Sequence, residues 1–255
     1  MEIGTRLVQD IKNASHICVL TGAGISAESG VATFRGKEGL WSKFKPQELA
    51  NMDAFMANPD LVWEWYQHRR DILTTVKPNP GHMALARWEE LAPKFTLVTQ
   101  NVDGLHLMAG SRNVLELHGN IRINRCNRCG SESSMEEITF AGKVPMCPCG
   151  GMLRPGVVWF GEMLPPGVFE AAAEASQRCD LFLTIGTSAV VYPAASLPEI
   201  ALSRGIPVIE VNMEETPLSG SVTYHLLGPA GTILPELVEI FERGRRDSSS
   251  GSVAQ

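Results

Sequence analysis

Short, largely apolar segments alternate along the chain with longer stretches whose apolar residues recur at helical spacing. The short segments predict buried strands of a parallel sheet, and they occupy residues 16–21, 95–98, 114–117, 180–185 and 207–211. The longer stretches predict helices, and they occupy residues 2–12, 58–73, 80–88, 165–178 and 233–242. Strands that alternate with helices predict an α/β fold, with a doubly wound, Rossmann-like parallel sheet at its centre.

Polar side chains follow two of the predicted strands at the point where each strand ends. Gln100, Asn101 and Asp103 come directly after one strand, and His118 ends the next one. Because ligands of open α/β sheets bind beyond the carboxyl ends of the strands, we expect these side chains in one crevice. A histidine with a pKa near about 6.5 is suited to general base catalysis at neutral pH. For His118 taken alone, a hydrogen-bonded structural histidine is the alternative.

A glycine turn follows the first predicted strand. Gly22-Ala23-Gly24 leads into a helix start of small residues, and such a turn lets backbone N–H groups meet a phosphate. The full G-x-G-x-x-G fingerprint is missing, and no acidic residue ends a second strand about 20 residues further on, which argues against a hydride-transferring Rossmann domain. The next loop contains Phe34-Arg35, for which loop packing and a solvated charge are the ordinary alternative.

The composition is that of an ordinary globular protein. Of the 255 residues, 44% are hydrophobic and 20% are charged, which predicts one large domain or one domain with a smaller insertion. The net charge of −6 argues against a protein that mainly covers nucleic-acid phosphates. Apolar runs stay well short of the roughly 20 residues of a membrane span. The acidic residues near the N-terminus are atypical of secretory or transit peptides.

Four of the six cysteines form two short pairs, Cys126-x-x-Cys129 and Cys147-x-Cys149, which are separated by the 17 residues 130–146. This spacing predicts a structural zinc site with four thiolates, although the second pair departs from the commoner C-x-x-C. Clustered cysteines also indicate a reducing compartment, so we expect a cytoplasmic protein. Arginines make this insert basic, and a zinc-ribbon nucleic-acid-binding protein is therefore the alternative of another class; they are Arg122, Arg125 and Arg128.

Several motifs occur along the chain in the order GAGISAESGVATFRG, TQNVDGLH, LHG and GTSAVVYPAA. Together they resemble the sirtuins, which are NAD-dependent protein-lysine deacylases, and the resemblance extends over roughly residues 5–242. It implies that NAD is consumed while an acyl group leaves a protein lysine, giving nicotinamide, O-acyl-ADP-ribose and free lysine. A mono-ADP-ribosyltransferase with the same NAD site is the alternative.

The resemblance implies His118 and Asn101 as catalytic residues. Asn101 and Asp103 would orient the nicotinamide ribose and carboxamide, and Gln100 would help to position the ribose. After the acyl oxygen has expelled nicotinamide, His118 would act as general base through the ribose hydroxyls, and Phe34 would keep water out. The other cofactor-binding residues implied are Gly22, Ala23, Gly24, Glu28, Thr33, Arg35, Trp41, Val102, Gly186, Thr187, Ser188, Asn212, Met213, Glu214 and Ala230.

Two further segments are implied to bind the acylated substrate. Tyr66 and Arg69 share one face of a predicted helix, and a guanidinium beside a phenol suits a carboxylate. The Tyr-x-x-Arg pattern resembles class III sirtuins, which remove succinyl, malonyl and glutaryl groups; an ordinary surface pair is the alternative. Val158, Phe160 and Gly161 would hold the peptide by strand addition, although a plain strand between domains is equally compatible with these residues.

We expect two domains and a tail. An NAD-binding Rossmann-like domain would combine residues 1–35, 76–120 and 155–243. A smaller domain, inserted into it, would combine the helical segment 36–75, which includes a cofactor-binding loop, with the zinc insert 121–154. The polar tail 244–255 is expected to be disordered.

The expected partners are acylated-lysine proteins or peptides. We expect a monomeric, prokaryotic type of enzyme that contacts neither membrane nor, directly, nucleic acid, and a matured mitochondrial enzyme is the alternative. The sequence fixes neither the protein targets nor the relative activity on acetyl, succinyl and malonyl lysine.

Overall fold

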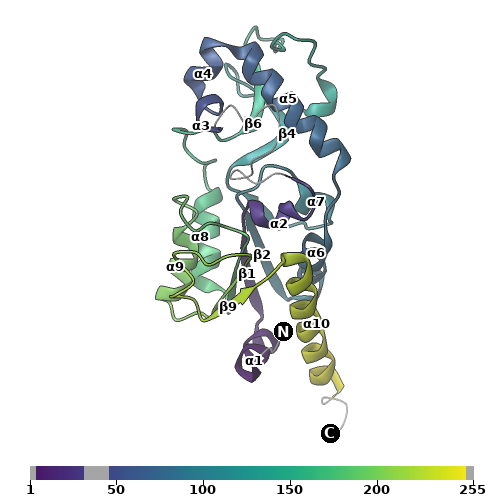
Figure 1. Ribbon diagram of the computed structural model, residues 1–255, viewed down its shortest axis with the longest axis vertical. Coiled ribbons are helices and arrows are strands. Elements are labelled where there is room, and N and C mark those ends of the chain that lie inside the picture. The colour runs from purple at the N-terminus through teal and green to yellow at the C-terminus, as the bar shows by residue number, and fades with distance from the viewer. Residues whose placement is uncertain (1–3, 32–45, 251–255) are drawn as a thin grey trace.

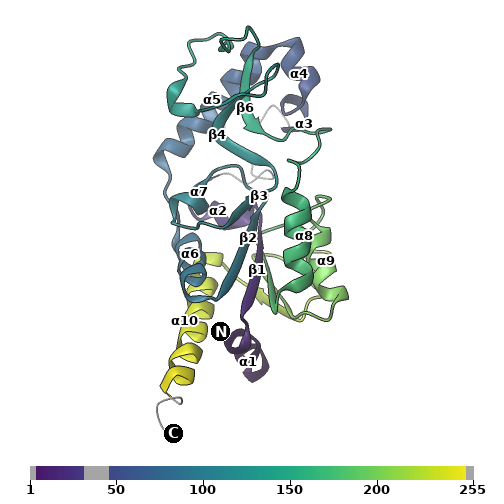
Figure 2. The same cartoon turned by 180° about the vertical axis from the view of Figure 1, so that it is seen from behind.

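The computed structural model describes residues 4–31 and 46–250, and its main body is built on a six-stranded parallel sheet (Figures 1 and 2). The strand order is β3-β2-β1-β7-β8-β9, and each neighbouring pair runs parallel. The strands are β1 (His16–Thr21), β2 (Lys94–Thr99), β3 (Val114–Glu116), β7 (Leu181–Ile185), β8 (Val208–Asn212) and β9 (Tyr224–Leu227). Five of them match predicted strands. The sixth, β9, is a partly exposed edge strand without a continuous apolar run, which explains why the pattern does not indicate it.

Helices cover both faces of this sheet, and Figures 1 and 2 show them on opposite sides. Trp88 and Phe241 lie in the apolar cluster of one face, whose helices are α1 (Thr5–Asn13), α6 (Pro80–Leu91) and α10 (Ala230–Ser250). Phe182 lies in the cluster of the other face, whose helices are α8 (Val168–Arg178) and α9 (Ser196–Ser203). The doubly wound, Rossmann-like fold is therefore confirmed.

Asparagine caps begin the last two helices before β2. Asn58 accepts a hydrogen bond from the Leu61 amide at the start of α5 (Pro59–Thr75). Asn79 accepts from two amides at the start of α6, and His82 completes a capping box there. The buried Asn79 side chain also donates to the carbonyl of Ile25 at 2.7 Å.

A smaller antiparallel sheet carries the cysteine pairs. Its order is β5-β4-β6, and its strands are β5 (Glu132–Ser134), β4 (Gly119–Cys126) and β6 (Leu153–Val157). Helix α5 packs on it: Trp63 donates its indole N–H to the carbonyl of Leu153, and the buried Arg70 donates to the carbonyls of Ile121 and Ile123. The helices α3 (Pro46–Leu49) and α4 (Met52–Ala57) precede α5. One apolar cluster draws on both segments of the expected smaller domain, while the domain boundaries themselves stay a prediction.

The last helix continues beyond its predicted end. We expected a helix over 233–242 and a disordered tail from residue 244, but α10 runs to Ser250. Arg245 donates to the carbonyl of Ala14 and stacks on Phe241, and ion pairs at i,i+4 spacing, such as Arg246–Glu242 at 3.1 Å, support the last turns. Contacts of charged side chains thus stabilise the last turns of the helix. The spacing of apolar residues gives no indication of such contacts. Residues 251–255 lie outside the described residues.

Across residues 4–31 and 46–250, no helix combines the length and the apolar character that crossing a membrane requires.

We expect Asn79→Ala to lower the free energy of unfolding by more than Asn58→Ala does. Loss of a cap costs about 1 kcal/mol, and only Asn79 also satisfies a buried carbonyl from another segment. Chemical denaturation of both variants and the wild type measures the difference. Equal losses of unfolding free energy would show that the hydrogen bond from Asn79 to Ile25 adds no stability beyond that of the cap.

Candidate active site

A cleft of about 2280 Å³ lies between the two sheets, along the carboxyl ends of the parallel strands. The residues that follow β1, β2, β3 and β7 line it, as does the last residue of β8. Predicted site residues on its wall are Gly22, Ala23, Gly24, Tyr66, Arg69, Gln100, Asn101, Val102, His118, Val158, Phe160, Gly161, Gly186, Thr187, Ser188, Asn212, Met213 and Glu214. Segments that are distant in the sequence therefore meet in one place.

The turns that follow β1 and β7 touch each other through glycine. The Gly24 amide donates to the carbonyl of Gly186 at 2.8 Å. A Cβ on Gly22 would lie 2.7 Å from the Gly186 oxygen, and a Cβ on Gly24 would lie 2.6 Å from the Gly186 Cα. Side chains at these positions would push the turns apart, so glycine is required for the two backbones to form one continuous wall.

Asn101 and Asp103 are held by a serine that the sequence analysis does not single out. The amide of Asn101 donates to the Gly22 carbonyl (3.0 Å) and to the Ser26 hydroxyl (3.2 Å). Ser26 in turn donates to Asp103 at 2.8 Å, and the other oxygen of Asp103 accepts the Leu105 amide. The side-chain oxygen of Asn101 is left as the group that a ligand can use. Asp103 is itself buried and supports Asn101 from behind rather than lining the cleft.

The hydrogen bond of His118 determines which of its nitrogens is basic. Nδ1 lies 2.9 Å from the carbonyl oxygen of Gln100. A carbonyl only accepts, so Nδ1 carries the hydrogen and Nε2 keeps the lone pair. Burial lowers the pKa of His118 below the usual 6.5, although the Gln100 carbonyl opposes this shift. The imidazole is therefore neutral at pH 7 and able to accept a proton.

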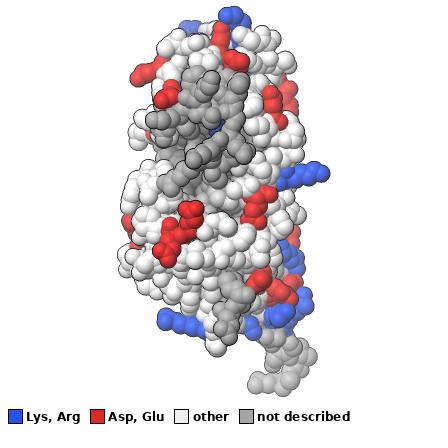
Figure 3. Space-filling model, in the orientation of Figure 1, with Lys and Arg blue, Asp and Glu red and all other residues white. Residues whose placement is uncertain are grey.

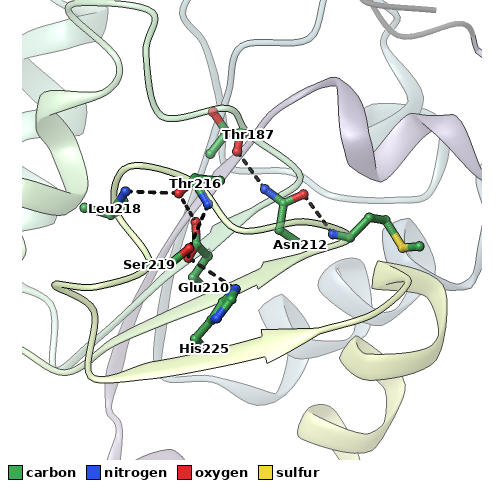
Figure 4. A network of polar contacts seen from close by, with 8 residues as sticks. Thr187, Glu210, Asn212, Thr216, Leu218, Ser219 and His225 are labelled. Atoms are coloured by element: carbon green, nitrogen blue, oxygen red, sulfur yellow. Dashed lines mark hydrogen bonds and ion pairs between the residues drawn. The ribbon is translucent and has the colours of Figure 1, made fainter.

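A chain of hydrogen bonds extends from His118 to the far end of the cleft. Gln100, which accepts from His118 through its backbone, donates its side-chain amide to the hydroxyl of Thr187 at 3.0 Å. Asn212 then donates to the carbonyl of Thr187 at 2.8 Å, as Figure 4 shows. The polar residues at the ends of β3, β2, β7 and β8 are thereby fixed relative to one another.

Tyr66 and Arg69 lie on the wall formed by α5. Tyr66 is 3% exposed, and its hydroxyl accepts the indole N–H of Trp159 at 2.8 Å. Burial raises the pKa of Tyr66 to about 12, so the phenol keeps its proton and can donate it. The guanidinium of Arg69 stacks on the ring of Trp65 at 5.0 Å. Burial lowers the pKa of Arg69, while Tyr66 and Asp103 oppose this, which marks a cation with reduced access to water.

The segment 158–161 runs along the cleft with several of its amides already bonded. Val158 donates its amide to the carbonyl of His118 at 2.8 Å, and Phe160 donates its amide to that of Ala50 at 2.9 Å. The Trp159 amide donates to Glu162. A peptide added to this segment would have to use its carbonyl oxygens or the Gly161 amide.

The four paired cysteines form a cluster whose geometry fits zinc. All four sulfur atoms lie within 4.8 Å of one another; Cys126 and Cys149 are 3.5 Å apart, and Cys129 and Cys147 are 3.7 Å apart. A tetrahedral ion with Zn–S bonds of about 2.3 Å requires sulfur atoms about 3.8 Å apart. The amides of Arg128 and Cys129 point at the Cys126 sulfur, at 3.4 and 3.5 Å, and help to compensate thiolate charge. These cysteines would hold one structural zinc ion.

Other predicted residues lie elsewhere. Glu28 is exposed and accepts the amide of Gly231 at 2.9 Å, and the buried Ala230 lies beside it at the start of α10. Neither is among the residues that line the cleft in the described parts of the chain. Thr33, Phe34, Arg35 and Trp41 lie outside the described residues. Trp159, like Ser26, has a partner far away in the sequence, so no local motif could indicate its role.

Comparison with known proteins identifies the family. The model of the Sir2 family matches residues 22–193. The chain belongs to the Sir2 family. The predicted sirtuin resemblance is thereby confirmed.

The relatives cover nearly the whole chain. The NAD-dependent protein deacylase 1 of Archaeoglobus fulgidus is 49% identical over 91% of this chain and 96% of its own. The NAD-dependent protein deacylase of Aquifex aeolicus is 52% identical over 88% of this chain and 94% of its own. A solved complex of a Sir2 homologue with NAD is 46% identical, covers 96% of this chain and 95% of its own, and superposes with a TM-score of 0.90. A solved Sir2–p53 peptide–NAD⁺ complex is 32% identical, covers 98% and 99%, and has a TM-score of 0.79.

We expect the rate of deacylation to fall as the pH is lowered through the pKa of His118, because only the neutral imidazole accepts a proton. Since burial lowers this pKa, the acid limb of the kcat/KM profile should lie below pH 6.5. His118→Ala should abolish turnover while circular dichroism shows a retained fold. His68→Ala, on the exposed face of α5, is the control and should keep the wild-type profile. An acid limb above pH 6.5 would contradict the assignment of the base.

We expect Cys147→Ser to lose bound zinc and to unfold at a lower temperature than the wild type, because three thiolates hold the ion less tightly than four. Metal analysis by mass spectrometry should give about one zinc ion per wild-type chain. Cys179→Ser, a buried cysteine outside the cluster, should keep the ion. Full zinc content in Cys147→Ser would rule out the four-thiolate site.

Proposed function

We propose that the chain removes acyl groups from protein lysine at the expense of NAD, and that it prefers acyl groups with a carboxylate, such as succinyl and malonyl, while still accepting acetyl. The first part is carried by the relatives, which are named NAD-dependent protein deacylases. The preference for a carboxylate rests on one observation, the pair Tyr66 and Arg69 on the wall of the cleft that also contains His118.

The cleft offers matching groups for the parts of NAD, which supplies the ribose carbon that receives the acyl oxygen. The contiguous turns around Gly22–Gly24 and Gly186–Ser188 suit the phosphates, because backbone can approach them closely. Asn101 presents its side-chain oxygen to the nicotinamide ribose and carboxamide. Asn212 suits the adenosine end, because it lies at the opposite end of the chain of hydrogen bonds from His118.

His118 is the general base in this proposal. Its Nε2 takes the proton of a ribose hydroxyl, while Nδ1 stays bonded to the Gln100 carbonyl. The backbone anchor prevents the ring from turning, so the lone pair keeps one direction during the transfer. Burial favours the neutral imidazole before the proton arrives.

The acyl group would meet two donors of different kinds. The Tyr66 hydroxyl already accepts from Trp159, so its own hydrogen remains for an acceptor. Arg69 offers a planar cation, and its reduced hydration strengthens its attraction for a carboxylate. A terminal carboxylate of succinyl or malonyl satisfies both, whereas acetyl ends in a methyl group.

The remaining expectations concern partners and location. We propose acylated-lysine proteins as substrates, held along 158–161, and a monomeric, cytoplasmic enzyme without direct contact to nucleic acid. The net charge of −6 supports the last point. On the face drawn in Figure 3, acidic side chains of the described residues lie among the basic ones.

We expect Arg69→Met to reduce kcat/KM for succinyl-lysine by about tenfold or more, because a charge-assisted hydrogen bond contributes about 1.5–3 kcal/mol. Activity on acetyl-lysine should change far less. One lysine peptide, succinylated or acetylated, is incubated with NAD and enzyme, and mass spectrometry follows the peptide and O-acyl-ADP-ribose. Tyr66→Phe should act in the same direction, and Glu64→Gln, exposed on the same helix, is the control.

The outcomes separate the parts of the proposal. Equal losses on both peptides would remove the carboxylate-binding role of Arg69 but leave the deacylase. A peptide that gains ADP-ribose would favour the mono-ADP-ribosyltransferase instead. Acyl loss without NAD would overturn the activity itself.

A further inference from the structure

A carboxylate is buried in the middle of a parallel strand. Glu210 lies in β8 between Ile209 and Val211, and only 1% of its surface is exposed. Parallel strands covered on both faces are ordinarily apolar throughout, and a buried carboxylate is costly unless it is hydrogen-bonded. Such a departure from the expected pattern usually marks a functional constraint.

Glu210 accepts two hydroxyl hydrogen bonds from the loop that follows its own strand. The hydroxyls of Thr216 and Ser219 each lie 2.5 Å from one of its carboxylate oxygens. Figure 4 shows both contacts converging on this side chain from one loop. His225, opposite Glu210 in β9, places its Nε2 3.6 Å from the carboxylate and contributes positive charge when protonated.

The direction of these hydrogen bonds requires an acceptor at Glu210. The Thr216 hydroxyl already accepts the Leu218 amide at 3.1 Å, and the Ser219 hydroxyl accepts the Thr216 amide at 2.8 Å. Each hydroxyl therefore passes its own hydrogen to the carboxylate, which completes a chain from N–H through O–H to O⁻ that strengthens each bond. A glutamine would present an NH₂ group to one of these hydroxyls, so that hydroxyl would lose its acceptor.

The loop fixed in this way forms part of the cleft. Glu214, Glu215, Thr216 and Pro217 line it next to Asn212, which lies two residues after Glu210 on the same strand. Residues two apart in a strand point to the same face, so Glu210 and Asn212 share one side of β8. Glu210 thus holds the loop on the strand that also carries Asn212, at the end of the cleft away from His118.

We infer that Glu210 is a positioning residue for the adenosine half of NAD, which acts by holding the loop 213–217 against the end of β8. The inference rests on the proposed placement of adenosine beside Asn212. Glu210 is not among the described residues that line the cleft, and it lies outside the motifs named in the sequence analysis.

The test is Glu210→Gln, which keeps the volume of the side chain. We expect the KM for NAD and the dissociation constant for ADP-ribose, measured by calorimetry, to rise by about fivefold or more, because charge-assisted hydrogen bonds are lost. The KM for the acylated peptide at saturating NAD and the inhibition by nicotinamide should stay unchanged. Glu236→Gln, exposed on α10, is the matched control and should leave all four quantities at their wild-type values.

Ser219→Ala removes one donor and leaves the carboxylate in place, so it provides the same test if Glu210→Gln does not fold. It should weaken ADP-ribose binding in the same direction and by a smaller factor. Wild-type affinity for ADP-ribose in folded Glu210→Gln or Ser219→Ala would overturn the inference, as would equal changes in the KM values for NAD and peptide. Failure of the wild-type enzyme to bind ADP-ribose would instead overturn the placement of NAD.

Discussion

The hydrogen bond between His118 Nδ1 and the Gln100 carbonyl is the interaction on which the chemistry of the cleft depends. It decides which nitrogen is basic, and it joins the end of β3 to the end of β2. The side chain of the same Gln100 reaches Thr187 after β7, which in turn accepts from Asn212 at the end of β8. The proposed base and the residues proposed to bind the nucleotide lie on different strands, and these hydrogen bonds fix them relative to one another. Parallel pairing makes this possible, because it places all these strand ends at one edge of the sheet.

Close backbone contact is the second constraint, and it acts between the strands that the hydrogen bonds connect. Gly22, Gly24 and Gly186 allow the turns after β1 and β7 to touch. The turn after β1 also supplies the Gly22 carbonyl that the side chain of Asn101 uses. A side chain on Gly22 would therefore displace the turn whose carbonyl Asn101 uses.

Local patterns predicted the features that are themselves local. Continuous apolar runs such as 181–185 correspond to central strands, and the cysteine spacing places four sulfur atoms together. The edge strand β9 and the continuation of α10 beyond residue 244 lie outside such patterns, because partial burial and ion pairs support them. The side-chain contacts that hold the site residues in place could not be predicted from the sequence either. Ser26 meets Asp103, and Trp159 meets Tyr66, only after the chain has folded. The sequence does show that Glu210 is a carboxylate inside an otherwise apolar strand. Its hydrogen-bond partners, however, can be identified only from the folded loop.

Trp159 connects the two segments that the proposed function assigns to the peptide and to the acyl group. Its backbone lies in the segment 158–161, and its indole donates to Tyr66 on α5, one turn from Arg69. Arg154, which stacks on the Trp159 ring and pairs with Glu162, fixes the same side chain from the other side. A peptide bound along this segment, as proposed, would therefore be coupled through Trp159 to the phenol that would meet the acyl group. Selection for the acyl group and affinity for the peptide share one rigid unit, so each should depend on the other. The strand ends proposed to bind NAD are held by a separate set of hydrogen bonds, which would leave acyl selection free to vary without change to the proposed base.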